Sequence, residues 1–241
     1  MIWTTPRIGL FAGPQGVRSY DLRTRRPLAS ATELSKVLEP LRGSKARLEV
    51  VLSDAHCRYL VMTRPEGIRS REELSAAVRN RFHAAFGDTQ AWQLSYAASP
   101  FNELDFVAGV DETRLRDLEE QARAAQLALV SVRPHWVAWA RHFRRQTRRG
   151  AHWIVVPDTE WLSLGYIVNG RCQQARALRL GAHTASLTDL LARERAFVED
   201  ADPGAAVWLA GGHMQAPTSQ LGAAVTQTSP EALWGIAEAR A

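Results

Sequence analysis

Residues 153–171, WIVVPDTEWLSLGYIVNGR, decide the fold that the sequence predicts. Residues 154–156 form a short apolar run, and from residue 162 to residue 168 apolar side chains recur at every second position, which is strand spacing. Asn169-Gly170 is the strongest short hairpin signal because both turn positions take a positive φ. With residues 172–180 as a third strand, the stretch predicts a β-meander that opens a new half of the protein.

The N-terminal region offers a similar unit. Residues 8–12 form a short apolar strand, Gly13-Pro-Gln-Gly16 forms a turn, and residues 17–22 form a second strand. The two units start at Ile8 and Ile154, and each leads to a helix. This parallel favours two related halves built on one plan.

Helices and strands alternate between the two units. Ser30 and Ser70 each stand three residues before a glutamate, which is capping-box spacing at the start of a helix, and Asp111 can cap a third helix. Strands are predicted at residues 48–52, 58–63, 92–96, 106–110, 127–132 and 207–212. The predicted class is therefore α/β with mixed sheets.

A fourth helix is predicted to begin at Pro134, a residue that suits the first turn of a helix. Its inner residues are expected to be Trp136, Ala140 and Phe143, and Trp139 is also expected in the core or an interface. The helix is predicted to run on into the arginine-rich residues 141–149.

Composition bounds the class of protein. The chain has 241 residues, of which 46% are hydrophobic, and no run of 18 apolar residues that would span a membrane. Its two cysteines, Cys57 and Cys172, are too few for a disulfide framework or a zinc site. These features predict a soluble protein of the reducing cytoplasm. The net charge of +5 permits an acidic partner without naming one.

The order of meander, helix, strand, insertion, strand, helix and second meander is the order of actin-like folds. Three stretches carry a closer resemblance: residues 48–62 (LEVVLSDAHCRYLVM), residues 106–115 (FVAGVDETRL) and residues 126–136. Their hydrophobic spacing resembles the cytoplasmic part of the type II secretion L component and its type IV pilus relatives, the PilM proteins.

This resemblance implies duplicated mixed sheets of the actin-like (ribonuclease H-like) kind. The first half is expected at residues 1–150 with a small α/β subdomain inserted around residues 56–104, and a reduced second half at residues 151–241. A second interpretation remains open, because residues 58–132 also read as a separate β-α-β-β-α-β lobe of the ferredoxin-like type. Under the resemblance, the last helix and strand of that run belong to the main sheet.

The resemblance also implies where a nucleotide would bind. Nucleotide-binding actin-like proteins open each half with a phosphate loop that bears aspartate and glycine. Here residues 10–16 contain no acid, and residues 156–160 contain acids but no glycine, while Pro157 removes a backbone donor. Gly211 and Gly212 resemble the adenosine-contacting glycine pair, although a turn at a strand end needs the same residues. ATP hydrolysis is therefore not expected. No cofactor is predicted, and binding of ATP–Mg²⁺ is disfavoured.

Other residues with chemical potential have simpler structural interpretations. Asp158 and Glu160 are candidates for a metal or acid/base pair, but acids in a hairpin turn are usually solvated. His135 and His142 share a face of the predicted helix and would need a third ligand from elsewhere, so no metal site is predicted. The remaining histidines, His56, His83, His152, His183 and His213, are scattered.

No nucleophilic site is predicted either. Cys57 stands beside an apolar strand without a Cys-x-x-Cys partner, which favours a small buried hydrophobic residue. Ser53, Asp54 and His56 have the residue types of a catalytic triad, but residues so close in sequence cannot adopt its geometry.

The strongest functional lead is a basic cluster formed by Arg141, Arg144, Arg145, Arg148 and Arg149. Spacings of three and four place most of these side chains on neighbouring rows of a helix. Such a cluster suits anionic lipid head groups, an acidic protein surface or nucleic acid phosphates. The alternative is a solvated helix end, where arginine also interacts favourably with the helix dipole.

Together these features predict a non-catalytic actin-like scaffold at the cytoplasmic face of a secretion or type IV pilus machine. Its expected partner is an assembly ATPase or an inner-membrane component, and its expected location is peripheral at the inner membrane. One alternative is an ATP-binding PilM-like protein with divergent phosphate loops. The other, a basic nucleic-acid-binding domain, ranks last because no aromatic-rich RNA motif or recognition helix is present.

Overall fold

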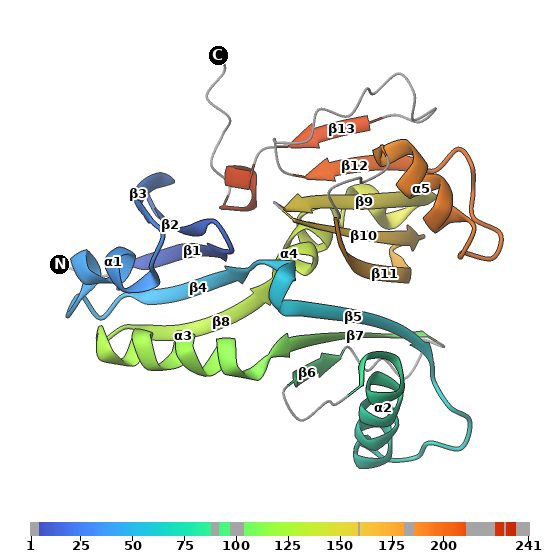
Figure 1. Cartoon of the computed structure of the whole chain (residues 1–241), viewed down its shortest axis with the longest axis horizontal. Helices are drawn as coiled ribbons and strands as arrows, with labels where there is room; N and C mark the ends of the chain where they lie inside the picture. The colour runs from blue at the N-terminus through green and yellow to red at the C-terminus, as the bar shows by residue number, and fades with distance from the viewer. Residues whose placement is uncertain are drawn as a thin grey trace.

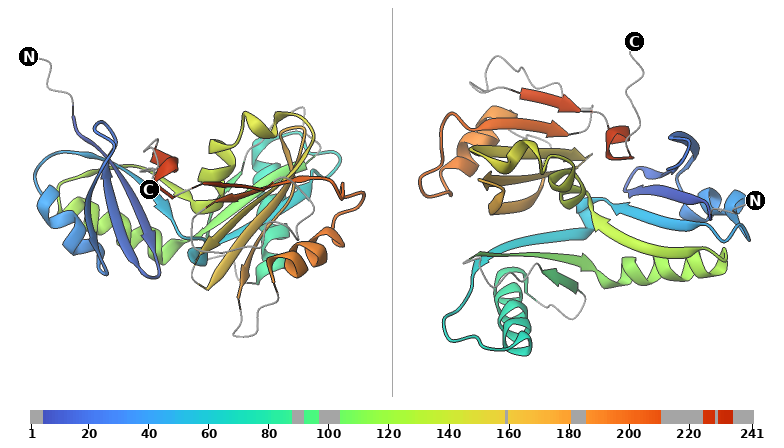
Figure 2. Two further views of the ribbon diagram at one scale, coloured as in Figure 1. Left: turned by 90° about the horizontal axis from the view of Figure 1, so that it is seen from above. Right: turned by 180° about the vertical axis from the view of Figure 1, so that it is seen from behind.

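Two five-stranded sheets with the same strand plan carry the chain, and a three-stranded sheet is inserted into the first (Figure 1). The structure is a computed structural model that describes residues 5–87, 92–96, 104–158, 160–180, 186–210, 225–228 and 230–234. Seen from above, the first and second sheets lie side by side (Figure 2).

The first sheet has the strand order β3-β2-β1-β4-β8. Its strands are β1 (Arg7–Gly13), β2 (Gly16–Asp21), β3 (Arg26–Ala31), β4 (Arg47–Leu52) and β8 (Ala128–Pro134). The strands β1, β2 and β3 form an antiparallel meander, whereas β4 and β8 run parallel to β1. The helices α1 (Leu34–Leu38) and α3 (Glu112–Ala124) connect these strands, with the short turn η1 (Glu39–Leu41) after α1.

The second sheet repeats this plan in the order β11-β10-β9-β12-β13. Its strands are β9 (Ala151–Asp158), β10 (Trp161–Val168), β11 (Arg171–Arg179), β12 (Ala206–Ala210) and β13 (Val225–Thr228). Again the first three strands form a meander, and the last two are parallel to the first. The helix α5 (Leu187–Arg195) and the turn η5 (Pro230–Trp234) complete this half. The predicted duplication is thus confirmed in topology.

The turn between β10 and β11 follows the sequence signal closely. Asn169 has φ 51° and Gly170 has φ 78°, so both occupy the left-handed region that a two-residue hairpin requires. The predicted meander at residues 153–180 is confirmed.

The inserted sheet has the order β5-β7-β6 and follows the turn η2 (Asp54–His56). Its strands are β5 (Cys57–Thr63), β6 (Trp92–Tyr96) and β7 (Leu104–Asp111), all antiparallel. The helix α2 (Arg71–Phe86) packs Leu74, Val78 and Phe82 on one face of this sheet, and the predicted capping box at Ser70 is present. Because β8 pairs with β4 in the first sheet, the separate ferredoxin-like lobe is wrong. The domain boundaries themselves stay a prediction.

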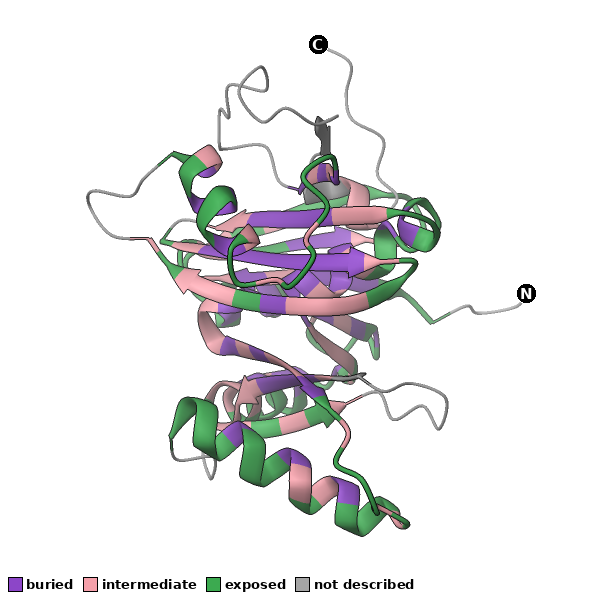
Figure 3. Ribbon diagram, turned by 90° about the vertical axis from the view of Figure 1, so that its right-hand side faces the viewer, coloured by how far each residue is buried: buried purple, intermediate pink, exposed green. Residues whose placement is uncertain are grey.

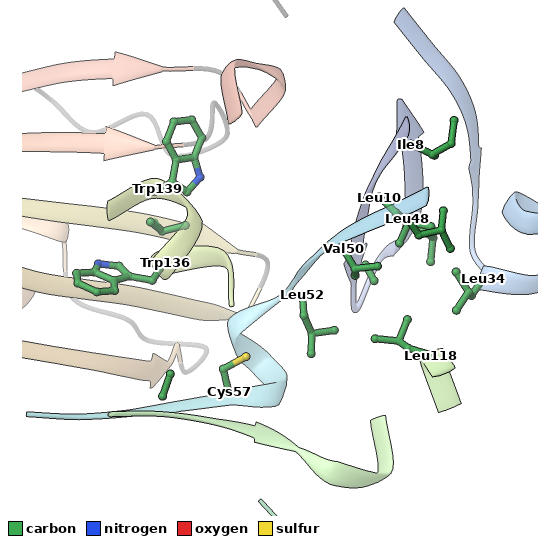
Figure 4. Close-up of a cluster of buried hydrophobic side chains, with 14 of the residues drawn as sticks. Ile8, Leu10, Leu34, Leu48, Val50, Leu52, Cys57, Leu118, Trp136 and Trp139 are labelled. Carbon is green, nitrogen blue, oxygen red and sulfur yellow. The ribbon is translucent and has the colours of Figure 1, made fainter. Parts of the chain in front are cut away.

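The helix α4 (His135–His142) joins the two halves, and its side chains belong to a core shared by both. In Figure 4, Trp136 and Trp139 project from α4 beside the second half, while Leu10 and Val50 lie on the first sheet. Trp136 donates its indole N–H to the carbonyl of Ile154 at 3.1 Å and packs on Gly165 of β10. A single aromatic side chain therefore connects α4 to two strands of the second sheet.

Two sequence predictions near helix ends are wrong. Ser30 lies in β3, a strand that the sequence did not indicate, and α1 begins after Glu33 without a side-chain cap. The helix α4 ends at His142, and the chain continues as a turn and then as η3 (Gln146–Arg148). Within α4, Trp136 is buried as predicted, whereas Ala140 is only half-buried.

No helix in the described ranges is long and apolar enough to cross a membrane.

We expect Gly165→Ala to weaken the junction between α4 and the second sheet. A Cβ at this position would lie 2.1 Å from Cζ2 of Trp136, so the indole must move out of a close-packed core. The free energy of unfolding, measured by chemical denaturation, should fall by about 1–3 kcal/mol or more. The matched control is Gly204→Ala, where the nearest atom is a side-chain oxygen at 3.3 Å. Equal stability of both variants would contradict the proposed role of Trp136.

Candidate functional site

The ends of strands from both halves meet at a polar junction. Ser53, which follows β4, donates its backbone N–H to the carbonyl of Ala12 in β1 at 2.8 Å. Its hydroxyl group donates to the carboxylate of Asp158 at the end of β9. Ser53 therefore links the first sheet directly to the second.

Asp54 is the buried acid of this junction. It accepts hydrogen bonds from the hydroxyl group of Tyr59 in β5 and from the backbone N–H of Trp136 at 3.0 Å. Burial raises the pKa of Asp54 to about 6, and the hydrogen bond from Tyr59 acts against this rise. One carboxyl group thus ties the first sheet, the inserted sheet and α4 together.

His135 lies beside this junction and is also buried. Its Nε2 accepts the indole N–H of Trp139 at 3.0 Å, which assigns the proton of the neutral ring to Nδ1. Burial lowers the pKa of His135 to about 4, so the ring is neutral at physiological pH. The ring of Phe11 packs edge-on against the ring of His135, with 4.8 Å between the ring centroids. The same phenyl ring also lies beside Gly13. The ring of Phe11 therefore lies near both His135 and the β1–β2 turn.

The structure separates several residues that the sequence placed together. The exposed His142 is not in a cluster with His135, and no group of three or more metal-ligating side chains occurs among the described residues. Glu160 is exposed and pairs with Arg179 at 3.1 Å, whereas Asp158 accepts from Ser53, so these two acids do not form a pair. Gly211 and Gly212 lie outside the described residues.

The predictions for the remaining small side chains can be placed as well. Cys57 is fully buried, and burial raises the pKa of its thiol well above the ordinary value, as expected for a structural cysteine. The hydroxyl of Ser53 is directed to Asp158 and the carboxyl of Asp54 to Tyr59. Ser53 and Asp54 thus each have a hydrogen-bond partner other than His56.

A hollow of about 910 Å³ lies between the inserted sheet and the second sheet. We call it the groove. The strand β5 and the end of α2 form one wall, and β11 with residues 197–200 forms the other. Figure 3 shows this side of the molecule, with the second sheet above and the inserted sheet below. In the sheets that the structure describes, β5 and β11 are both edge strands.

The groove carries two of the most exposed aromatic side chains. Phe86 at the end of α2 is 37% exposed, and Phe197 after α5 is 61% exposed. The guanidinium group of Arg176 lies over the ring of Phe197 at 4.8 Å. Sequence reasoning missed this site because its walls come from segments distant in sequence, and only exposed phenylalanines would have signalled it.

The basic cluster does not form the predicted helical row, because α4 ends at His142 and only Arg141 of the cluster lies in it. We call residues 144–149 the arginine loop. Arg144, Arg148 and Arg149 line a hollow of about 470 Å³ together with Asn169 and Gly170 of the β10–β11 turn. Arg141 and Arg145 are exposed nearby on the chain but do not line this hollow.

Comparisons with known proteins address the fold. No protein-family model matches the chain, and no curated protein matches its sequence. Among solved structures, the PilM–PilN type IV pilus biogenesis complex matches with a TM-score of 0.68 and 15% identity, covering 94% of this chain and 89% of that chain. The chain has the actin-like fold.

Two further structures support this assignment. The cytoplasmic domain of EpsL, an inner membrane component of the type II secretion system of Vibrio cholerae, matches with a TM-score of 0.61 and 11% identity. That match covers 95% of this chain and 92% of EpsL's domain. A Bacteroides thetaiotaomicron protein with an actin-like ATPase fold matches with a TM-score of 0.59 and 10% identity, covering 92% and 91% of the two chains. The resemblance to these proteins extends across nearly the whole chain.

We expect Asp54 and His135 to give the protein two opposing dependences of stability on pH. The pKa of Asp54 is about 6 in the folded protein, above its ordinary 3.8, so its contribution to stability is lost as pH rises through this range. The pKa of His135 is about 4, below its ordinary 6.5, so its contribution is gained as pH rises from about 4 to 6.5.

Single substitutions should separate the two contributions. Relative to the unsubstituted protein, Asp54→Asn should gain stability between pH 4 and pH 6.5, and His135→Gln should lose stability over the same range. Each change should be on the order of 3 kcal/mol, measured by chemical denaturation across this pH range. The same pH profile in all three proteins would show that neither group is buried as described.

Proposed function

We propose that this chain is a non-catalytic actin-like scaffold of a bacterial secretion or type IV pilus assembly machine. It acts at the cytoplasmic face of the inner membrane, where it docks an assembly ATPase or an inner-membrane component. The observation that carries this proposal is the match of nearly the whole chain to EpsL's cytoplasmic domain and to PilM in complex with PilN. Both of those proteins belong to such machines by their descriptions.

The proposal includes no ATP turnover, and the residues at the β1–β2 turn and at the β9–β10 turn support this part of it. The first turn consists of Pro14 and Gln15 between the paired residues Gly13 and Gly16, and proline offers no N–H to a phosphate. The ring of Phe11 lies beside this turn, and at the second turn Asp158 is already engaged by Ser53. A phosphate loop instead needs several free backbone N–H groups and an available carboxylate for Mg²⁺.

We expect no binding of ATP, with or without Mg²⁺, in calorimetry on the purified chain. An actin-like ATPase measured in the same buffer serves as the positive control. Micromolar binding accompanied by a rise in the melting temperature would contradict the non-catalytic scaffold and favour an ATP-binding protein with divergent loops.

The groove is the surface that we propose for the docked partner. Phe86 and Phe197 offer apolar contacts on its opposite walls. The proposed occupant is therefore a segment of the partner that places an apolar side chain against these two rings.

We expect Phe197→Ser and Phe86→Ser each to weaken partner binding by about tenfold or more, because truncating an aromatic anchor typically costs at least 1–2 kcal/mol. The measurement is the Kd for purified cytoplasmic segments of the inner-membrane components and for the assembly ATPase of the same organism. Leu28→Ser is the matched control, since Leu28 is 47% exposed on β3, outside the groove.

Two outcomes would count against these proposals. If no component of either machine binds the unsubstituted chain, the scaffold function is wrong. If a component binds all three variants as tightly as the unsubstituted chain, the scaffold function stands and the groove is not its docking surface.

A further inference from the structure

The arginine loop is held in a fixed shape by its contacts with the core and with the β10–β11 turn. Thr147 is buried, and its hydroxyl and backbone N–H both donate to the carbonyl of Phe143, at 3.1 and 3.0 Å. The backbone N–H of Gly150 donates to the side-chain carbonyl of Asn169 at 3.0 Å, and the N–H of Asn169 donates to the carbonyl of Gly150 at 2.9 Å. The loop is therefore anchored on both sides of its arginines.

A further contact fixes the end of the loop. The indole N–H of Trp208 donates to Nδ1 of His152 at 3.2 Å, so the proton of the neutral imidazole lies on Nε2. This Nε2 lies 2.6 Å from the carbonyl of Arg149 and donates to it. The backbone of Arg149 is thus tied to β12 through β9. The backbone that carries three arginines is held in place around one hollow, which reduces the backbone entropy lost on binding a ligand.

The charge of this loop is not neutralised within the described part of the protein. Elsewhere arginines pair with acids, for example Arg7 and Arg133 with Glu49 and Arg179 with Glu160. Arg144, Arg148 and Arg149 are exposed, and no described acid pairs with them. A concave site with three uncompensated guanidinium groups attracts an anion, and guanidinium groups bind phosphate through two parallel hydrogen bonds.

We propose that the hollow formed by Arg144, Arg148 and Arg149 with the β10–β11 turn binds the phosphate of an anionic lipid head group. This contact holds the arginine loop against the membrane. The proposal rests on the proposed function in one respect, because a machine of the inner membrane brings this surface to lipid. It adds a ligand and a binding site that the docking of a protein partner does not require.

The form of the site favours a head group over a nucleic acid. The hollow, about 470 Å³ in volume, sits at a single turn, whereas a nucleic acid strand needs a long basic groove that follows its backbone. Single strands also stack their bases on aromatic side chains, but Phe143 and Trp139 next to the loop are buried. Basic residues near a surface bind anionic lipids through the negative potential of the membrane, and the exposed Arg141 and Arg145 would add to this attraction.

The test is sedimentation of the full chain with vesicles of phosphatidylcholine alone or mixed with phosphatidylglycerol. We expect binding only to the mixed vesicles. The triple variant R144E/R148E/R149E should reduce that binding at least tenfold. The matched control R18E/R23E/R26E makes the same change in net charge on exposed arginines of β2, β3 and their turn and should reduce it much less. An equal loss in both variants would overturn the site, because the attraction would then come from net charge alone.

A second variant tests the geometry of the hollow. R144K/R148K/R149K keeps the charge but lacks the planar guanidinium groups, so it should weaken vesicle binding several-fold. If the lysine variant binds the mixed vesicles as tightly as the unsubstituted chain, the hollow is not a specific phosphate-binding site. If the charge-reversal variant is not folded by circular dichroism, R148E alone replaces it in the same comparison.

Two competitors and one further measurement separate this site from other ligands and from the proposed function. Inorganic phosphate at millimolar concentration should displace the chain only partly from the mixed vesicles. Tight binding of phosphate without vesicle binding, or tighter binding of single-stranded DNA than of vesicles, would overturn the lipid assignment. Partner binding by R144E/R148E/R149E should be unchanged. If the unsubstituted chain binds its partner but does not bind the mixed vesicles, the lipid site is refuted and the scaffold function stands.

Discussion

The carboxyl group of Asp54 holds the inserted sheet and the start of α4 against the first sheet, next to the direct link from Ser53 to Asp158 of the second sheet. Leaving water is costly for a carboxyl group, and the cost is offset only if its hydrogen-bond partners are held in place. Tyr59 supplies one partner from the inserted sheet, and the first turn of α4 supplies the other. The start of α4 is thereby fixed, and Trp136 reaches Ile154 and Gly165 of the second sheet from that position.

The side chains of the polar junction are occupied by one another, so the two candidate binding surfaces lie elsewhere, on the outside of the molecule. The groove and the arginine loop both adjoin the β10–β11 hairpin, since Val168 lines the groove and Asn169 lines the hollow of the loop. The proposed protein-binding surface and the proposed anion-binding surface therefore lie at one end of one hairpin. The order of strands, rather than a catalytic constellation, is what brings them together.

Local signals in the sequence predicted much of this fold, and contacts between distant segments account for the errors. Asn169-Gly170, Ser70 and Asp111 act within a few residues, so each turn or cap follows from the sequence itself. The strand β3 was missed because Ser30 has capping-box spacing, while pairing with β2 decides its conformation. The arginines of the arginine loop have helical spacing in the sequence, but α4 ends before the loop, and Thr147 within the loop is buried. Neither the burial of Asp54 nor the groove has a local pattern, because both exist only after the halves meet.

Arg58 of β5 carries a consequence for observing this molecule. Its guanidinium group lies 5.4 Å from the ring of Trp92 in the inserted sheet and 4.8 Å from the ring of Trp161 in the second sheet. It also lines the groove, so a ligand that widens or narrows the groove must change the distance between this cation and at least one indole. Indole emission responds to a neighbouring charge. Among the eight tryptophans of the chain, Trp92 and Trp161 are therefore two whose fluorescence should respond to a ligand in the groove.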